Sequence, residues 1–344
     1  MRIVQAISRS GCSSGGSIQA LLLAKALKDL GHRVLFVSRG GDCERRAVEL
    51  GVEHASNPMG NNPADLARFA LLCRKADVIH AHKGRALFCA LFAKLVAGGI
   101  RVFANRGVSF PLEWGNRWKY RLSDGVVCVS FGIVRDLAKE GLDPRRLRVV
   151  YGSVDGRFFG AAPCRIPGLE DGDFAVLLVG NFRPWKGHLI LAEAASRLID
   201  RAKNLTLVFA GKEKKSLLEQ VRNRFEGKLI SLGYRRDVEK IMAASQILVN
   251  ASTEGEGVPG VLREAMAVGV CVVASSLEGN REMIEHKKNG YLFEVGRAEE
   301  LSAMLEKLFH NPKLRMRAAV NGKRYATRFT LENRARAMLR VYGG

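Results

Sequence analysis

Residues 247–274 read ILVNASTEGEGVPGVLREAMAVGVCVVA. The short apolar runs Ile247–Val249 and Cys271–Ala274 each predict a buried strand. Between them, the Gly-Val-Pro-Gly turn at 257–260 leads straight into a helical pattern. A strand, a turn, a helix and a further strand make up one repeating unit of a parallel sheet. This stretch therefore predicts an α/β fold.

The same alternation of apolar runs and helical patterns recurs along all 344 residues. It predicts two doubly wound parallel sheets, each of which binds ligands at the carboxyl ends of its strands. Residues 160–173 carry two prolines and three glycines without periodicity, which is typical of a linker. We therefore expect an N-terminal domain at 1–160, a linker at 161–173, a second domain at 174–325, and a helix at 326–344 that packs back on the first domain. The expected strands are 1–7, 34–38, 78–82, 101–104, 126–129, 148–150, 175–179, 205–209, 229–232, 247–249 and 271–274.

The formal net charge of +21 favours anionic partners. Residues 1–160 hold 25 of the 55 basic and 13 of the 34 acidic residues, so the excess is spread over both halves. The seven cysteines contain no C-x-x-C pair, which predicts neither a zinc site nor a disulfide framework and fits reduced thiols in a cytoplasmic protein. The longest apolar stretch, 86–100, is too short and too interrupted for a membrane span.

Two glutamates frame the turn at 257–260. Glu256 precedes it, and Glu264 lies about one turn into the following helix. A helix N-terminus offers unpaired N–H groups and a positive dipole to a phosphate or a sugar oxygen. The pair therefore predicts a site for a phosphorylated sugar.

The spacing Glu256-x7-Glu264, followed by Ala-Met-Ala-x-Gly and a strand, resembles the motif of family 4 retaining glycosyltransferases of the two-domain GT-B fold. The resemblance implies that Glu256 contacts the donor sugar, that Glu264 binds the ribose diol, and that the intervening loop holds the diphosphate. This donor segment comprises Glu256, Gly257, Val258, Pro259, Gly260, Val261 and Glu264. Further along, Glu278-Gly279 stands where the family commonly has two glycines.

A second motif, Gly180 to His188, leaves a strand and enters a helix. It resembles the family's basic motif, which implies that Arg183 and Lys186 clamp the donor diphosphate and that Gly180 lies beside it. Cations at this point stabilise the charge that builds on a departing diphosphate. The family often has arginine directly after the glycine, where this chain has Asn181.

The N-terminal half resembles the family more loosely. Gly15 and Gly16 resemble its flexible loop near the donor, and His82 and Lys83 lie at a strand end on the acceptor side. His80 is expected to alternate away from His82 as a packed core residue. Arg106 stands where many members have histidine, which points to a subgroup that attaches sugars to lipopolysaccharide or similar anionic acceptors.

Together these motifs imply a hexosyl- or heptosyl-type transferase that needs no metal and no cofactor besides its nucleotide-sugar co-substrate. Asp171-Gly172-Asp173 has the metal-binding D-x-D pattern, but its position ahead of a strand predicts a turn. A sugar-nucleotide epimerase on the same fold and a nucleic-acid-binding protein are the alternatives. Against nucleic acid, no DNA-reading motif and no basic strand with aromatics is found.

The basic surface fits peripheral attachment to an anionic inner leaflet, where glycolipid acceptors lie. One segment combines cations and aromatic rings and is a candidate docking patch, with a solvated helix face as the alternative. It contains Trp114, Arg117, Trp118, Lys119, Tyr120 and Arg121.

Overall fold

The computed structural model describes residues 1–11, 15–255 and 257–343. Within that part of the chain, no helix combines the length and the apolar character that a bilayer crossing needs.

The chain divides into two compact units. Unit 1 comprises Met1–Ser153 and Phe329–Gly344, and unit 2 comprises Val154–Arg328. The observed division differs from the predicted one, because the first boundary falls at Ser153 rather than 160 and residues 161–173 belong to unit 2. The last of these linker residues, Asp173, forms an ion pair with Lys228 of unit 2, with 2.8 Å between Lys228 Nζ and Asp173 Oδ2.

Unit 1 is built on a seven-stranded parallel sheet in the order β3-β2-β1-β4-β5-β6-β7. Alternate residues of each strand enter different cores, as period-two geometry requires. Ile3 faces one core and Val4 the other. The strands are β1 (Arg2–Ala6), β2 (Arg33–Ser38), β3 (Glu53–Ser56), β4 (Val78–Ala81), β5 (Arg101–Arg106), β6 (Gly125–Cys128) and β7 (Leu147–Val149).

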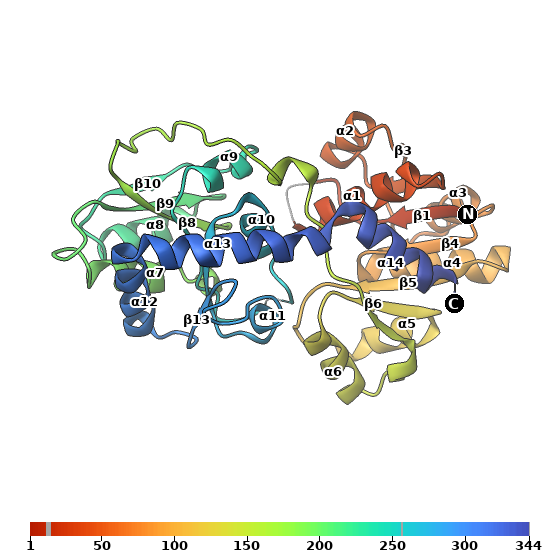
Figure 1. Ribbon diagram of the computed structural model, residues 1–344. Coiled ribbons are helices and arrows are strands. Elements are labelled where there is room, and N and C mark those ends of the chain that lie inside the picture. The colour runs from red at the N-terminus through yellow and green to blue at the C-terminus, as the bar shows by residue number, and fades with distance from the viewer. Residues whose placement is uncertain (12–14, 256, 344) are drawn as a thin grey trace. The chain divides into compact units, whose positions relative to one another are not determined.

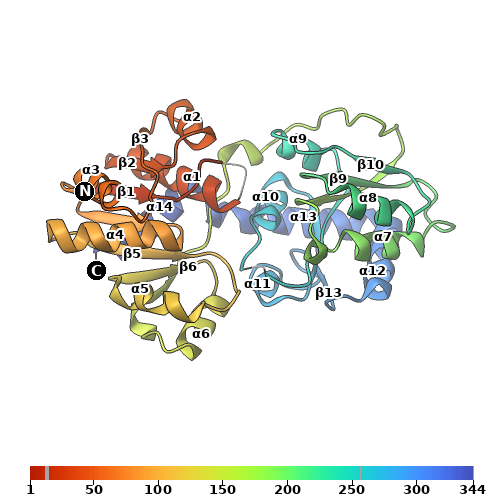
Figure 2. The same ribbon diagram turned by 180° about the vertical axis from the view of Figure 1, so that it is seen from behind.

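Helices cover both faces of this sheet. One face packs against α1 (Gly15–Asp29), α2 (Asp42–Glu49) and α14 (Leu331–Gly343). The other face packs against α3 (Pro63–Cys73), α4 (Gly84–Ala97), α5 (Arg117–Leu122) and α6 (Phe131–Lys139). Figure 2 shows α4 lying along β4 and β5.

The last helix is anchored in unit 1. Figure 1 shows α14 lying against α1, and Tyr342 near its end is completely buried. The Tyr342 hydroxyl accepts a hydrogen bond from Gln5 Nε2 at 3.1 Å and lies 2.8 Å from His80 Nδ1. The side chain of Arg334 donates to Gln19 O and Oε1 at 2.7 and 2.8 Å. Hydrogen bonds as well as apolar packing therefore hold α14 on the sheet.

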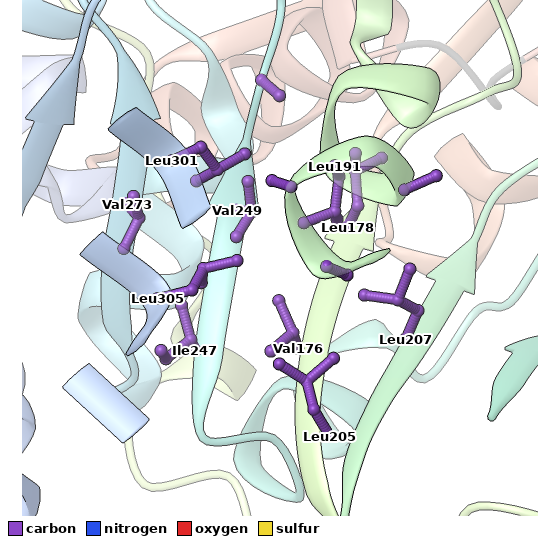
Figure 3. Packing of buried hydrophobic residues seen from close by; sticks show 14 of the residues in the cluster. Val176, Leu178, Leu191, Leu205, Leu207, Ile247, Val249, Val273, Leu301 and Leu305 are labelled. Atoms are coloured by element: carbon purple, nitrogen blue, oxygen red, sulfur yellow. The ribbon is translucent and has the colours of Figure 1, made fainter. Parts of the chain in front are cut away.

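Unit 2 repeats the plan with a six-stranded parallel sheet in the order β10-β9-β8-β11-β12-β13. Figure 3 shows the core under one face, where Val176, Leu178 and Ile247 point toward Leu191 and Leu305 of the covering helices. The strands are β8 (Phe174–Val179), β9 (Leu205–Ala210), β10 (Leu229–Ser231), β11 (Ile247–Asn250), β12 (Cys271–Ser275) and β13 (Tyr291–Phe293).

Two sets of helices flank this sheet. The core of Figure 3 includes residues of α7 (His188–Ser196), α8 (Lys215–Arg222), α12 (Ala298–His310) and α13 (Pro312–Ala326). Residues such as Ala175 and Leu177, which alternate with that core, are also buried. The remaining helices are α9 (Val238–Ala243), α10 (Gly260–Val268) and α11 (Glu278–Arg281), and α10 contacts β11 and β12.

Candidate active site

The strand order reverses direction at one point in each sheet. In unit 2 the chain runs outward from β8 to β10 and, in the other direction, from β11 to β13, so the reversal lies between β8 and β11. In unit 1 it lies between β1 and β4. Loops diverge at such a point and leave a crevice beyond the carboxyl ends of the strands. Apart from Gly15 and Gly16, the predicted donor residues follow β8 and β11. Of the predicted acceptor-side residues, His82 and Lys83 follow β4 and Arg106 ends β5.

The loop after β8 presents two cations. Arg183 is exposed, and its guanidinium lies 5.9 Å from the centroid of the Trp185 ring. Lys186 ends a 3₁₀ turn and is half-buried, with its stem passing Gly180, whose added Cβ would lie 3.6 Å from Lys186 Cδ. The turn holds both side chains at the carboxyl edge of the sheet.

Close backbone approach fixes this loop. Gly187 has φ 73°, and a Cβ there would lie 2.0 Å from Ala251 O. Thr253 N donates to Trp185 O at 2.8 Å, so the loops after β8 and β11 are bound to each other. Asn181, at the position where arginine is frequent, accepts a hydrogen bond from Lys212 N at 2.9 Å through its Oδ1. Asn181 therefore braces the loop.

The loop after β11 carries the predicted donor segment. Glu256 lies outside the described residues. Gly257, Val258 and Pro259 are buried, α10 begins at Gly260, and Val261 is half-buried in its first turn. Gly279 makes this arrangement possible, because a Cβ there would lie 1.3 Å from Gly257 O. The single glycine of the Glu278-Gly279 pair is thus the one that the loop needs.

Glu264 is half-buried on α10, and a Cβ on Gly260 would lie 3.6 Å from its Oε1. Burial raises the pKa of the Glu264 carboxyl, while the positive charges of Arg263 and Arg157 partly offset this effect. Arg157 Nη1 donates to Arg236 O at 3.0 Å and lies 3.6 Å from Glu239 Oε2. The carboxylate therefore lies at a helix start among fixed charges, where it can accept hydroxyl hydrogen bonds.

His188 is the first residue of α7 and packs against Phe182 in the loop after β8. Its buried imidazole stacks on Phe182, with 4.1 Å between ring centroids. Burial lowers the pKa of His188 to about 4. An unfolded imidazole takes up a proton as the pH falls below about 6.5, whereas the folded one stays neutral until near its lowered pKa. Stability gained at neutral pH is therefore lost as the pH falls through this window.

We expect the protonation of this histidine in the unfolded state to lower the free energy of unfolding by about 2 kcal/mol as the pH falls from 7 to 5. The His188→Phe variant keeps the stacking ring and removes the titrating group, so it should lose about that much less over the same interval. Urea unfolding at the two pH values measures the difference. Equal losses in the two proteins would show that His188 does not titrate differently on folding.

In unit 1, three cations lie at the carboxyl ends of neighbouring strands. Arg9 follows β1, Lys83 follows β4, and Arg106 ends β5. Burial lowers the pKa of Lys83, and the positive charges of Arg9 and Arg106 lower it further. Arg106 donates through Nη2 to Phe110 O. Among the described residues, none of the three cations has a carboxylate within ion-pair distance.

His82 is buried and belongs to a hydrogen-bonded network with the sheet and α14. Its Nε2 lies 2.7 Å from Gln5 Oε1, and Gln5 in turn donates to Tyr342. The expectation that His80 alternates away from His82 is wrong, because strand residues two apart share a face. The two rings lie 4.3 Å apart, and His80 is buried, as predicted for a packed core residue.

Gly15 and Gly16 differ in setting from the prediction. They form the exposed first turn of α1 rather than part of the preceding loop, and a Cβ at either would meet no atom within 4 Å. The Asp171–Asp173 segment is a turn with Gly172 at φ 93°. Across the described residues, no three His, Cys, Asp or Glu side chains group as metal ligands would.

The sequence motifs did not predict three charged residues near the site: Arg9, Arg157 and Glu239. Each lies outside the quoted motifs, and only tertiary contacts bring them to Lys83 or Glu264. Their residue types alone carry no signal, because isolated charged residues are usually solvated.

Two family models match the chain. "Glycosyltransferase Family 4" matches residues 13–157, and "Glycosyl transferases group 1" matches residues 165–325. Among curated relatives, UDP-Gal:alpha-D-GlcNAc-diphosphoundecaprenol alpha-1,3-galactosyltransferase of Escherichia coli is 24% identical over 64% of this chain and 63% of its own length. N-acetyl-alpha-D-glucosaminyl L-malate synthase of Bacillus anthracis is 26% identical over 83% of this chain and 82% of its own.

Solved structures share the fold. Anabaena HepE in complex with UDP aligns over 100% of both chains with a TM-score of 0.87 and 21% identity. Sucrose-phosphate synthase from Thermosynechococcus elongatus aligns over 100% of this chain and 98% of its own, with a TM-score of 0.79 and 16% identity. These similarities confirm the predicted GT-B architecture of two parallel-sheet α/β domains. With one matching model for each half, the chain belongs to the family 4 glycosyltransferases, the group 1 glycosyl transferases.

Proposed function

We propose that this protein transfers a sugar from a uridine diphosphate sugar to a hydroxyl of an anionic acceptor, with retention of the anomeric configuration. The proposal rests on the two loops at the reversal between β8 and β11, which are hydrogen-bonded to each other. One loop carries Arg183 and Lys186, and the other leads into α10 with Glu264. The UDP-Gal named for the E. coli relative and the UDP bound in the HepE complex support uridine as the base. The epimerase and nucleic-acid alternatives gain no support from these relatives.

In this proposal the donor diphosphate lies against unit 2. Lys186 and Arg183 stabilise the negative charge that develops on the departing diphosphate, and the backbone N–H groups of residues 257, 258, 260 and 261 face it as oriented donors, Pro259 having none. Glu264 accepts hydrogen bonds from the ribose diol, and Glu256 contacts the sugar. An oxygen of the departing diphosphate takes the proton of the attacking hydroxyl, so no protein nucleophile is required. The cations take the place of a metal, so we expect activity to persist in EDTA.

The acceptor is proposed to carry a negative charge near Lys83, Arg106 and Arg9. An anionic ligand would strongly stabilise the charged form of a partly desolvated lysine that has two arginines and no carboxylate beside it. The names of the two curated relatives include a diphosphoundecaprenol and L-malate, and both of these are anionic. We propose a lipid-linked or lipopolysaccharide-type glycan of the cytoplasmic side as the acceptor, with a hexose or heptose as the transferred sugar.

Peripheral attachment to an anionic membrane is part of the same proposal. Lys119 Nζ lies 5.8 Å from the centroid of the Trp118 ring and 5.9 Å from that of Phe88, and Trp118 is 43% exposed. Cations that accompany exposed aromatic rings suit a headgroup interface. We expect co-sedimentation with vesicles to rise with their anionic lipid content, and an unchanged bound fraction would remove this part of the proposal.

Calorimetric titration without metal tests the donor site. UDP is expected to bind the wild type more tightly than GDP, ADP or CMP. The Glu264→Ala variant should lose at least about tenfold in affinity, because two ribose hydroxyls lose their charged acceptor. Glu254→Ala, in the same loop, serves as the matched control and should bind UDP like the wild type. If no nucleotide binds the wild type, the donor site is misassigned; turnover of donor without acceptor would favour an epimerase.

A further inference from the structure

A cavity of about 660 Å³ lies within unit 2, and none of its lining residues is among those proposed for the donor. Its lining comes from α11 and the turn that follows it on one side, and from the C-terminal part of α13 with Arg328 on the other. Figure 1 shows α13 running past α11. The volume falls within the range of about 300–1,000 Å³ that is common for small-molecule sites.

Hydrogen bonds hold the walls of this cavity in place. Asn289 Nδ2 donates to Met283 O at 3.1 Å, and its Oδ1 accepts from Glu285 N at 2.8 Å. Asn321 Nδ2 donates to Lys288 O at 2.9 Å, which binds α13 to the turn. A ligand would therefore meet walls that are already fixed, which lowers the entropic cost of binding.

The lining carries an excess of positive charge. Lys288 is paired with Glu285 at 2.9 Å, so arginines supply most of the available charge. The side chain of Arg324 is exposed and forms no hydrogen bond or ion pair with the described residues. Four cations against two carboxylates leave two positive charges, which matches a phosphomonoester of charge about −1.5 to −2 at pH 7. The charged lining residues are Arg281, Glu282, Glu285, Lys288, Arg324 and Arg328.

Apolar groups complete the lining. Met283 and Ile284 are almost completely buried and support the wall, whereas the half-buried ring of Tyr325, whose centroid lies 5.4 Å from the Arg328 guanidinium, offers apolar surface. This combination suits a ligand that has a phosphoryl group and a ring with C–H surface. We propose that the cavity between α11 and α13 is a second ligand site, which binds a phosphorylated sugar independently of the donor site.

Calorimetric titration of the full chain with α-D-glucose 1-phosphate tests the proposal. The wild type should bind it, and Arg324→Gln should weaken binding about tenfold or more because a charge-assisted hydrogen bond is lost. Lys323→Gln removes the same charge from the neighbouring position of α13, which does not line the cavity, and should bind like the wild type. Glucose and inorganic phosphate alone should each bind more weakly than the ester.

Four outcomes would overturn the proposal. The first is a wild type that does not bind the ester. The second is equal weakening by Arg324→Gln and Lys323→Gln, which would indicate only a general effect of net charge. The third is inorganic phosphate binding as tightly as the ester, which leaves the sugar without a role. The fourth is binding lost in Glu264→Ala but kept in Arg324→Gln, which would place the probe in the donor site. UDP binding is measured separately, so failure here leaves the proposed transferase function standing.

Discussion

Replacing Lys186 by methionine is expected to lower kcat about 10²–10³-fold with a smaller change in KM. The lysine charge gains most of its interaction energy as negative charge accumulates on the departing diphosphate, so its loss affects the transition state more than the bound donor. Methionine keeps the length of the stem that passes Gly180, which preserves the packing of the 3₁₀ turn. Initial rates of transfer with varied donor, at saturating acceptor, measure both constants.

Lys212→Met provides the matched control for this prediction. Lys212 is exposed after the neighbouring strand β9, and it contacts the loop after β8 through its backbone: its N–H donates to Asn181 and its carbonyl accepts from Phe182 N. We expect its kcat to stay within about twofold of the wild type, as for most surface substitutions. Equal losses in the two variants would mean that general surface charge, rather than Lys186, drives the effect. A Lys186 variant that raises KM alone would assign the lysine to ground-state binding.

Replacing Gly279 by alanine is expected to abolish most nucleotide binding. The added methyl group would lie 1.3 Å from Gly257 O, so the loop before α10 must move. That loop carries the proposed diphosphate amides, and a displacement of about 1 Å at such groups costs on the order of 10²-fold. Overpacking also lowers the free energy of unfolding by about 1–3 kcal/mol. Titration with UDP and urea unfolding measure the two effects.

Gly156→Ala is the corresponding control, because a methyl group there meets no atom within 4 Å and the residue also belongs to unit 2. It should leave UDP affinity and stability near the wild-type values. If Gly279→Ala binds UDP normally, the loop before α10 accommodates the change and its amides do not fix the diphosphate. If stability falls while binding persists, the glycine serves packing alone.

Apolar runs were enough to predict the central strands of both sheets, because these strands are buried on both faces. The edge strands β3 and β13 were not predicted. β3 reads EHAS and is largely polar, and β13 has only three residues, so neither shows a clear period. The linker at 161–173 has a loop composition, but composition does not reveal which unit a loop packs against.

Of the predicted site residues, Arg183, Lys186 and Glu264 lie beyond the carboxyl ends of the adjacent strands β8 and β11, as their place after two apolar runs predicts for a parallel sheet. The bracing role of Asn181 was not predictable, since it depends on the backbone of Lys212 in another loop. The same holds for the cluster of Arg9, Lys83 and Arg106, whose strands meet only through sheet order. Motif spacing reflects local geometry, whereas the contact of Asn181 and the cluster of three cations depend on tertiary packing.

The burial of Tyr342 in unit 1 means that unit 1 can complete its fold only after all of unit 2 has been synthesised. Unit 2 is one continuous segment, whereas unit 1 lacks α14 until residues 331–343 have been synthesised. At elongation rates of about 5–20 residues per second, roughly 10–40 s separate the synthesis of Ser153 from that of Tyr342. During that interval Gln5, His80 and Phe103 lack the tyrosine that covers them. Nascent chains of this protein should therefore expose a binding surface for chaperones at the first unit, and a stop codon just before Tyr342 should prolong that exposure indefinitely.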